Sequence, residues 1–237
     1  MHPTQPTHEH HHRRVQGGAA RAAVFGVSDG LVSNVSLILG VAGANTSSGV
    51  VRLAGLAGLV GGAFSMASGE YVSMKAQTEL LQRELDMERI EITRRPESER
   101  RELAQIYRNR GIDPALADDL ATEMHRDPDL ALETHAREEL GIDPAELGSP
   151  VHAAVSSFGA FAGGAVLPLI PWLFAGGNGA ILASVVIGAL AALAVGAALA
   201  RFTGRPTLRL AARQLAFAAA AAGVAFLVGN AVGVGVV

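Results

Sequence analysis

The feature that most constrains this chain is the separation of its charged residues from its long apolar stretches. Residues 150–237 contain no Asp or Glu, and their only basic residues are four arginines. Residues 75–148 hold 19 of the 22 acidic residues and 11 of the 19 basic ones. Soluble cores seldom need several apolar runs of about twenty residues, whereas each bilayer-spanning helix needs about that length. The pattern therefore predicts an all-α, polytopic membrane protein.

Five apolar segments have the length of membrane spans. They cover residues 22–44, 53–74, 150–174, 179–200 and 208–236. We expect a disordered polar tail at 1–20, two spans within 21–74, a charged helical domain at 75–148, and three spans within 149–237. Pro168 and Pro171 predict a kink or an end of the third span, and Trp172 beside them is expected to be an interfacial anchor.

The second span runs into the charged domain without a helix-breaking residue. No proline occurs between Leu53 and Arg95, and the glycines of this stretch lie in its apolar half. We expect one helix that crosses the bilayer, continues into water and ends near Pro96. Three shorter helices should follow, beginning at Glu97, Pro114 and Pro128, because proline suits the first helical turn.

The basic residues near the predicted spans fall on one side of the membrane. The N-terminal arginines, the charged domain and the arginines between the last two spans share that side, whereas the opposite loops carry only Arg52. Because cytoplasmic loops are enriched in basic residues, the N-terminus and the charged domain are predicted to be cytoplasmic. The C-terminus is then expected outside.

Ionisable residues inside the predicted spans are candidates for a transport path. Asp29 lies within the first span, where a carboxylate costs at least ~2.5–3.5 kcal/mol and usually serves a function. The alternative is that Asp29 caps a helix that begins at Gly30. Met66 and Glu70 are four residues apart in the second span, so they share one helix face.

A second set of candidates lies in the charged domain. Acidic or imidazole side chains recur at helical spacing on three predicted helices, namely Glu84, Glu88 and Glu91, then Glu99 and Glu102, then His135 and Glu139. Such stripes hold divalent metals in helical proteins, and iron, manganese or zinc would suit these ligands. Cysteine is absent, so thiolate sites are excluded. The alternative is a solvated, salt-bridged surface, because arginines are interleaved with the acids.

Two sequence motifs carry a resemblance to a known family. FGVSDGLVSNVSLILGVAGA, followed by GAFSMASGEYVSMKAQTEL and a glutamate-rich region, resembles the vacuolar iron transporter family. The resemblance extends from about Arg21 to the C-terminus, and the chain looks like a bacterial member. The family consists of dimeric exporters of ferrous iron and related divalent metals in exchange for protons.

The resemblance assigns roles to particular residues of this chain. It implies that Asp29 and Met66 line the translocation path near the interface of a homodimer. It also implies a set of ligands in the cytosolic domain, namely Glu88, Glu91, Glu99, Glu102 and Glu139.

Three positions depart from the family's pattern. Many members carry a methionine pair before the last glutamate, where this chain has His135 and Ala136, so imidazole favours harder or borderline ions. Gly58 stands where some members have an acidic residue in the second span, and Glu70 is expected to supply that charge. Ala22 stands where some relatives have an acid at the entrance of the first span.

The sequence thus predicts a transporter that exports cytosolic ferrous iron, or manganese, by proton antiport across a bacterial plasma membrane. The expected partners are metal ions, protons, lipid and a second copy of the chain, with no cofactor and no nucleic acid. The alternative is a membrane-anchored metal buffer or sensor without transport. An enzyme such as a ferroxidase is not expected, because no Glu-x-x-His pattern lies on the acidic stripes. Histidines in the tail (His8, His10, His11 and His12) are either a weak metal site or part of a flexible tail.

Overall fold

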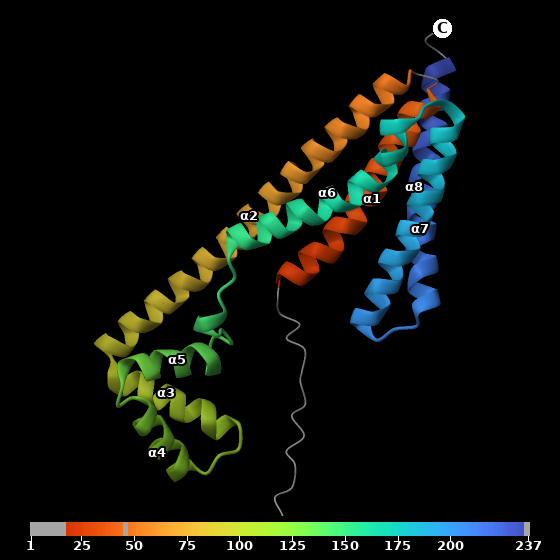
Figure 1. The fold of residues 1–237 in the computed structure, drawn as a ribbon. Helices are drawn as coiled ribbons and strands as arrows, with labels where there is room; N and C mark the ends of the chain where they lie inside the picture. The colour runs from red at the N-terminus through yellow and green to blue at the C-terminus, as the bar shows by residue number, and fades with distance from the viewer. Residues whose placement is uncertain (1–17, 45–46, 235–237) are drawn as a thin grey trace, which may run out of the picture. The chain divides into compact units, whose positions relative to one another are not determined.

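The computed structural model describes residues 18–44 and 47–234, and every element within them is helical (Figure 1). The elements are α1 (Gly18–Gly43), α2 (Ser48–Arg94), α3 (Pro96–Asn109), α4 (Pro114–Met124), α5 (Pro128–Glu138), a 3₁₀ turn (Pro144–Glu146), α6 (Pro150–Phe174), α7 (Gly177–Thr203) and α8 (Thr207–Val234). The all-α prediction is confirmed. Helix α1 begins inside the predicted tail, whose histidines lie outside the described residues.

Five of the described helices are long and apolar enough to cross a membrane. They are α1, α2, α6, α7 and α8, which confirms the predicted number of spans. Their outward faces carry large apolar side chains such as Leu208 and Phe217, which are 83% and 64% exposed. A monomeric soluble protein rarely exposes extensive apolar surface, so these faces suit contact with lipid.

Helix α2 is the predicted continuous helix, with 47 residues from Ser48 to Arg94. The contacts between residues divide the chain into two compact units, and α2 contributes residues to both. The first unit holds residues 1–67 and 155–237, and the second holds residues 68–154.

In the first unit, glycines let the membrane helices approach closely. Helix α1 packs along α8 and α7, and α7 packs along α8 (Figure 1). A Cβ atom at Gly229 of α8 would overlap the carbonyl of Gly40 in α1, and one at Gly196 of α7 would lie 2.5 Å from the Cα of Ala211 in α8. Backbones therefore meet where side chains would otherwise separate them, as small residues permit between membrane helices.

Helix α6 has the predicted bounds, since it includes Pro168 and Pro171 and ends at Phe174, three residues after the second proline. Ser184 of α7 supports this region, since its hydroxyl donates to the Pro168 carbonyl at 2.7 Å and accepts from Trp172 Nε1 at 2.9 Å. Trp172 is only 2% exposed and packs in an apolar cluster with Ile38, so it is a core residue rather than an interfacial anchor.

In the second unit, short helices begin and end where the sequence predicts. Asp113 and Asp127 cap α4 and α5 by accepting hydrogen bonds from backbone amides, and a proline occupies the first turn of each. Gly111 and Gly141 follow α3 and α5 with φ of +90° and +66°, which a residue without a Cβ adopts freely.

Ion pairs hold the three short helices together around a small core. Arg108 of α3 donates to both carboxylate oxygens of Asp118 in α4, at 2.6 and 2.7 Å. Arg110 at the end of α3 pairs with Glu138 of α5. The apolar core of these helices is small and consists mainly of Leu103 and buried alanines.

Candidate metal centre

Three side chains from two helices converge in the second unit. Nδ1 of His135, on α5, lies 3.0 Å from Oε1 of Glu88 on α2 and 3.3 Å from Oε2 of Glu139, which follows α5. Among the described residues, these three form the one group of His, Asp and Glu whose ligand atoms all lie within 4.8 Å of one another. Such spacing allows a single ion to contact all three.

The centre is largely shielded from solvent. His135 is fully buried and Glu88 is 4% exposed, while the side chain of Glu139 is about one-third exposed. Nε2 of His135 is buried without a hydrogen-bond partner among the described residues. Buried polar atoms are normally satisfied, so this nitrogen can accept a ligand or a water.

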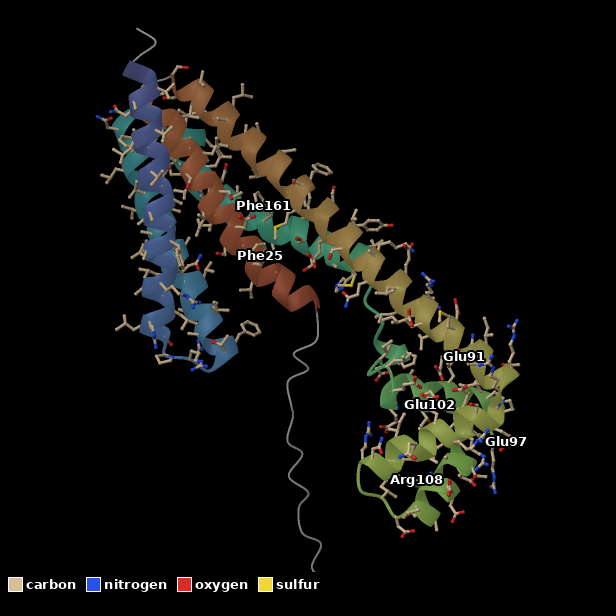
Figure 2. The ribbon with its side chains drawn as sticks, turned by 180° about the vertical axis from the view of Figure 1, so that it is seen from behind. Phe25, Glu91, Glu97, Glu102, Arg108 and Phe161 are labelled. Carbon is tan, nitrogen blue, oxygen red and sulfur yellow. The ribbon has the colours of Figure 1, made fainter. Side chains whose placement is uncertain are left out.

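Helix α3 adds two carboxylates to the same region. Figure 2 shows Glu91 on α2 and Glu102 on α3, both in the second unit. Glu99 of α3 is 7% exposed, and burial raises its pKa above 4.5. The negative charges of Glu88, Glu102 and Glu91 raise the pKa further, so these carboxylates lie close enough to repel one another.

His135 and Glu139 influence each other's protonation. Burial raises the pKa of Glu139, and the charges of Glu88 and Glu102 act in the same direction, against the hydrogen bond from His135. Burial disfavours the charged form of His135, but the carboxylates of Glu88 and Glu139 outweigh it and raise its pKa above 6.5. A divalent cation bound here would therefore compete with protons for these groups.

His125 is a neighbour that the sequence analysis missed. Its ring meets the ring of His135 edge to face, with centroids 5.2 Å apart, and its Nδ1 lies 2.9 Å from the carbonyl of Ala121. Its Nε2 is buried without a partner, and burial lowers its pKa. His125 follows α4 and lies off the acidic stripes, so helical spacing could not reveal it.

The structure decides between the two interpretations of the acidic stripes for some residues. Glu88 and Glu99 are buried, which excludes a solvated helix surface at those positions. Glu91 and Glu102 are exposed, as is Glu84 in part. The arrangement can offer a divalent first-row ion both carboxylate oxygens and imidazole nitrogen.

The candidate residues in the spans are not members of this group. Asp29 is in the interior of α1 and accepts a hydrogen bond from Ser33 at 3.1 Å, so it does not cap a helix beginning at Gly30. Met66 packs against the buried apolar cluster of Ala63 and Phe161. Glu70 is half-buried one turn later on α2.

Gly58 has a steric reason for lacking a side chain. A Cβ there would lie 2.8 Å from Oδ1 of Asn34 and 2.5 Å from a methyl carbon of Leu37. Asn34 is buried, and its amide donates to the Ala165 carbonyl at 2.6 Å. A larger residue at position 58 therefore requires the side chains of Leu37 and Asn34 to move.

Five spanning helices and a buried carboxylate–imidazole group define an integral membrane protein with a candidate metal centre in its second unit. The family model described as "VIT family" matches residues 20–230. The chain belongs to the VIT family, the vacuolar iron transporters. Membership places it among transporters rather than enzymes, as predicted.

Three relatives show how far the similarity extends. Vacuolar iron transporter 1 of Arabidopsis thaliana is 34% identical over 221 residues, which cover 92% of this chain and 88% of that protein. Vacuolar iron transporter 1 of Eucalyptus grandis is 33% identical, with coverage of 91% and 87%. The vacuolar iron transporter of Acanthamoeba castellanii is 35% identical, with coverage of 89% and 78%.

Proposed function

We propose that this protein exports ferrous iron from the cytosol and that the second unit captures the metal. The observation that carries the proposal is the buried group of Glu88, His135 and Glu139, with Glu99 beside it. Relatives of similar length bear the name vacuolar iron transporter, which supports iron as the cargo.

Capture follows from the electrostatics of the centre. Burial and mutual repulsion make several ionised carboxylates unfavourable together, so a divalent cation relieves both costs when it binds. We assign ligand roles to residues of α2, α3 and α5 and to the residue that directly follows α5. They are Glu88, Glu91, Glu99, Glu102, His135 and Glu139. Mixed oxygen and nitrogen donors suit Fe²⁺ and Mn²⁺, and manganese is the second proposed cargo.

The proposed path through the membrane uses Asp29, Met66 and Glu70. A carboxylate in a low-dielectric span is costly and commonly marks an ion pathway, and Asp29 has this position in the interior of α1. We propose that two copies of the chain form this path as a homodimer. Metal and protons competing for the same carboxylates would couple export to proton entry.

The proposed location is a bacterial plasma membrane, with the N-terminus and the second unit in the cytoplasm and the C-terminus outside. The distribution of arginines supports this orientation, because basic residues favour cytoplasmic loops.

The deciding experiment is metal flux into proteoliposomes that contain the full chain. Fe²⁺, Mn²⁺ and Zn²⁺ are compared with and without a pH gradient, under anaerobic conditions for iron. If a proton gradient accelerates the flux of Fe²⁺, the protein is an antiporter. If the flux does not depend on the gradient, metal export is not coupled to proton entry. Metal binding without any flux would favour the alternative of a membrane-anchored buffer or sensor.

A further inference from the structure

Two histidines of the second unit share one hydrogen-bonding pattern. Nδ1 of His125 lies 2.9 Å from the carbonyl oxygen of Ala121. Nδ1 of His135 lies 3.0 Å from Glu88 and 3.3 Å from Glu139. In both rings Nε2 is buried and has no hydrogen-bond partner among the described residues. His125 is not a member of the compact group of Glu88, His135 and Glu139, so the proposed centre gives its free nitrogen no role.

The partners of Nδ1 decide which nitrogen of each ring can bind a cation. A carbonyl oxygen carries no proton, so the contact with Ala121 requires Nδ1 of His125 to donate. In the neutral ring the lone pair then lies on Nε2. The carboxylate of Glu88 has the same effect on His135, and histidines that bind metals usually donate their other N–H to a carbonyl or a carboxylate. Each ring therefore presents its buried Nε2 as a ligand.

The two rings have the separation that a shared ion requires. Their centroids are 5.2 Å apart and their planes are inclined by 85°. When two imidazoles bind one tetrahedral ion at ~2.1 Å from each nitrogen, their ring centres lie roughly 5 Å apart. Aromatic rings also pack edge to face at such distances without an ion. Packing alone, however, leaves two buried nitrogens unsatisfied, which native structures normally avoid.

The charges around His125 permit a cation. Glu88 and Arg100 both lie close enough to influence His125, and they act in opposite directions. Arg100 pairs with Glu97 at 2.9 Å and donates to Thr122 at 3.3 Å, so a carboxylate balances its charge. Glu88 is 4% exposed, and a buried charge acts through a medium of low dielectric constant. The carboxylate of Glu88 therefore remains to attract a cation toward the two rings.

We infer that His125 and His135 bind one divalent ion through their Nε2 atoms, with water in the open coordination positions. The inference rests on the proposed function, because it adds a nitrogen site to the unit that captures metal. The ion lies at the Nε2 edge of His135, and Glu88 and Glu139 at the Nδ1 edge remain ligands for a further ion. Affinity for such ligands rises from Mn²⁺ through Fe²⁺ to Co²⁺, so the pair favours borderline ions such as Co²⁺ and Zn²⁺ over Mn²⁺.

The test counts the imidazoles bound to Cu²⁺ in the purified full chain. Pulsed electron paramagnetic resonance detects the uncoordinated nitrogen of each bound ring and so counts the rings. His125→Phe keeps an aromatic ring without nitrogen, and His152→Ala is the matched control, because His152 is exposed. Histidines of the N-terminal tail would also bind Cu²⁺, so every protein tested carries alanine in their place, at His2, His8, His10, His11 and His12.

We expect two bound imidazoles in the tail-substituted chain, two in His152→Ala and one in His125→Phe. In competition titrations His125→Phe should lower the affinity for Zn²⁺ roughly 100-fold and the affinity for Mn²⁺ about tenfold.

The count in the tail-substituted chain decides the inference even if His125→Phe does not fold. A single bound imidazole there overturns the inference and leaves the proposed centre intact, as does an unchanged count in a folded His125→Phe. Loss of an imidazole in His152→Ala also overturns it. If no imidazole is bound and no metal binds stoichiometrically, the proposed metal capture fails as well.

Discussion

Nδ1 of His135 lies 3.0 Å from Oε1 of Glu88, although the two residues are 47 positions apart in the sequence. The contact joins the end of α5 to the charged part of α2, and both side chains are almost completely buried. An imidazole and a carboxylate removed from water stabilise each other only while both are present. Removing either one should therefore affect metal binding and local packing together.

Glu88→Gln should weaken metal binding while preserving the shape of the side chain. Loss of one buried carboxylate should cost at least the roughly 10–100-fold that changes around metal ligands cause. The measurement is calorimetric titration of the purified full chain with Mn²⁺, and with Fe²⁺ under anaerobic conditions. Glu79→Gln, which removes an exposed partner of Lys75, is the control and should bind normally. Normal affinity in Glu88→Gln would remove Glu88 from the ligand set.

His125→Ala should lower metal affinity about 10-fold, on the scale of residues that position ligands. The reason is its edge-to-face contact with His135, which restrains the orientation of that ring. The same titration tests it, with the exposed His152→Ala as the control. If His125→Phe restores affinity, then ring packing alone explains the effect, whereas failure to restore it indicates a role for the nitrogen.

Glu99→Gln should stabilise the metal-free protein near pH 7 and weaken metal binding. The Glu99 carboxyl has its ordinary pKa of 4.5 in the unfolded chain and a raised pKa in the folded protein. The protonated carboxyl therefore contributes to folding stability below pH 4.5, and this contribution is lost as the pH rises through the raised pKa. Glutamine does not ionise, so its contribution to stability does not change with pH. We expect a gain on the order of 1 kcal/mol, roughly 2–4 °C in Tm. Thermal unfolding with chelator checks this, and no gain should occur near pH 4.

Metal affinity should rise with pH from about pH 5 to pH 8. The raised pKa of Glu99 and of Glu139 keeps protons on these groups above the usual range of carboxylic acids, and the raised pKa of His135 extends proton binding beyond 6.5. A metal must displace those protons, so each bound proton weakens apparent affinity. Titrations at several pH values, with proton release measured in two buffers, check the slope. A flat profile would contradict the proton competition.

Asp29→Asn should abolish most transport while leaving metal binding by the second unit intact. The amide keeps the size and the hydrogen bond from Ser33 but removes the charge that would attract a cation inside α1. Flux in proteoliposomes and calorimetry on the same preparation separate the two effects. Ser33→Ala removes only the hydrogen bond and should retain most flux. Wild-type flux in Asp29→Asn would place the path elsewhere.

The sequence predicted the helical architecture well because its signals are local. Apolar length identified the five spans, and the absence of proline before Pro96 identified the continuous helix α2. Asp113 and Asp127 identified the starts of α4 and α5 through their capping chemistry. Trp172 misled, because its place beside two prolines suggested an interfacial anchor, whereas its indole is buried and donates to Ser184 of α7.

The candidate centre was predicted only in part. Helical spacing selected Glu88, His135 and Glu139, which the structure brings together. Spacing could not show that Glu88 is buried and Glu91 exposed, since that depends on how α3 and α5 pack. His125 remained hidden because it lies in a turn, where no periodicity applies.

The capping of the short helices has a consequence for how this protein is made. Helices α3, α4 and α5 carry their own start signals or early prolines, and Arg108 pairs with Asp118 only ten residues away. Contacts of such short separation form quickly, and domains fold as units during synthesis. We expect the three helices to assemble on the ribosome before α6 is translated, so that α2 is already anchored at its far end when the last three spans enter the bilayer.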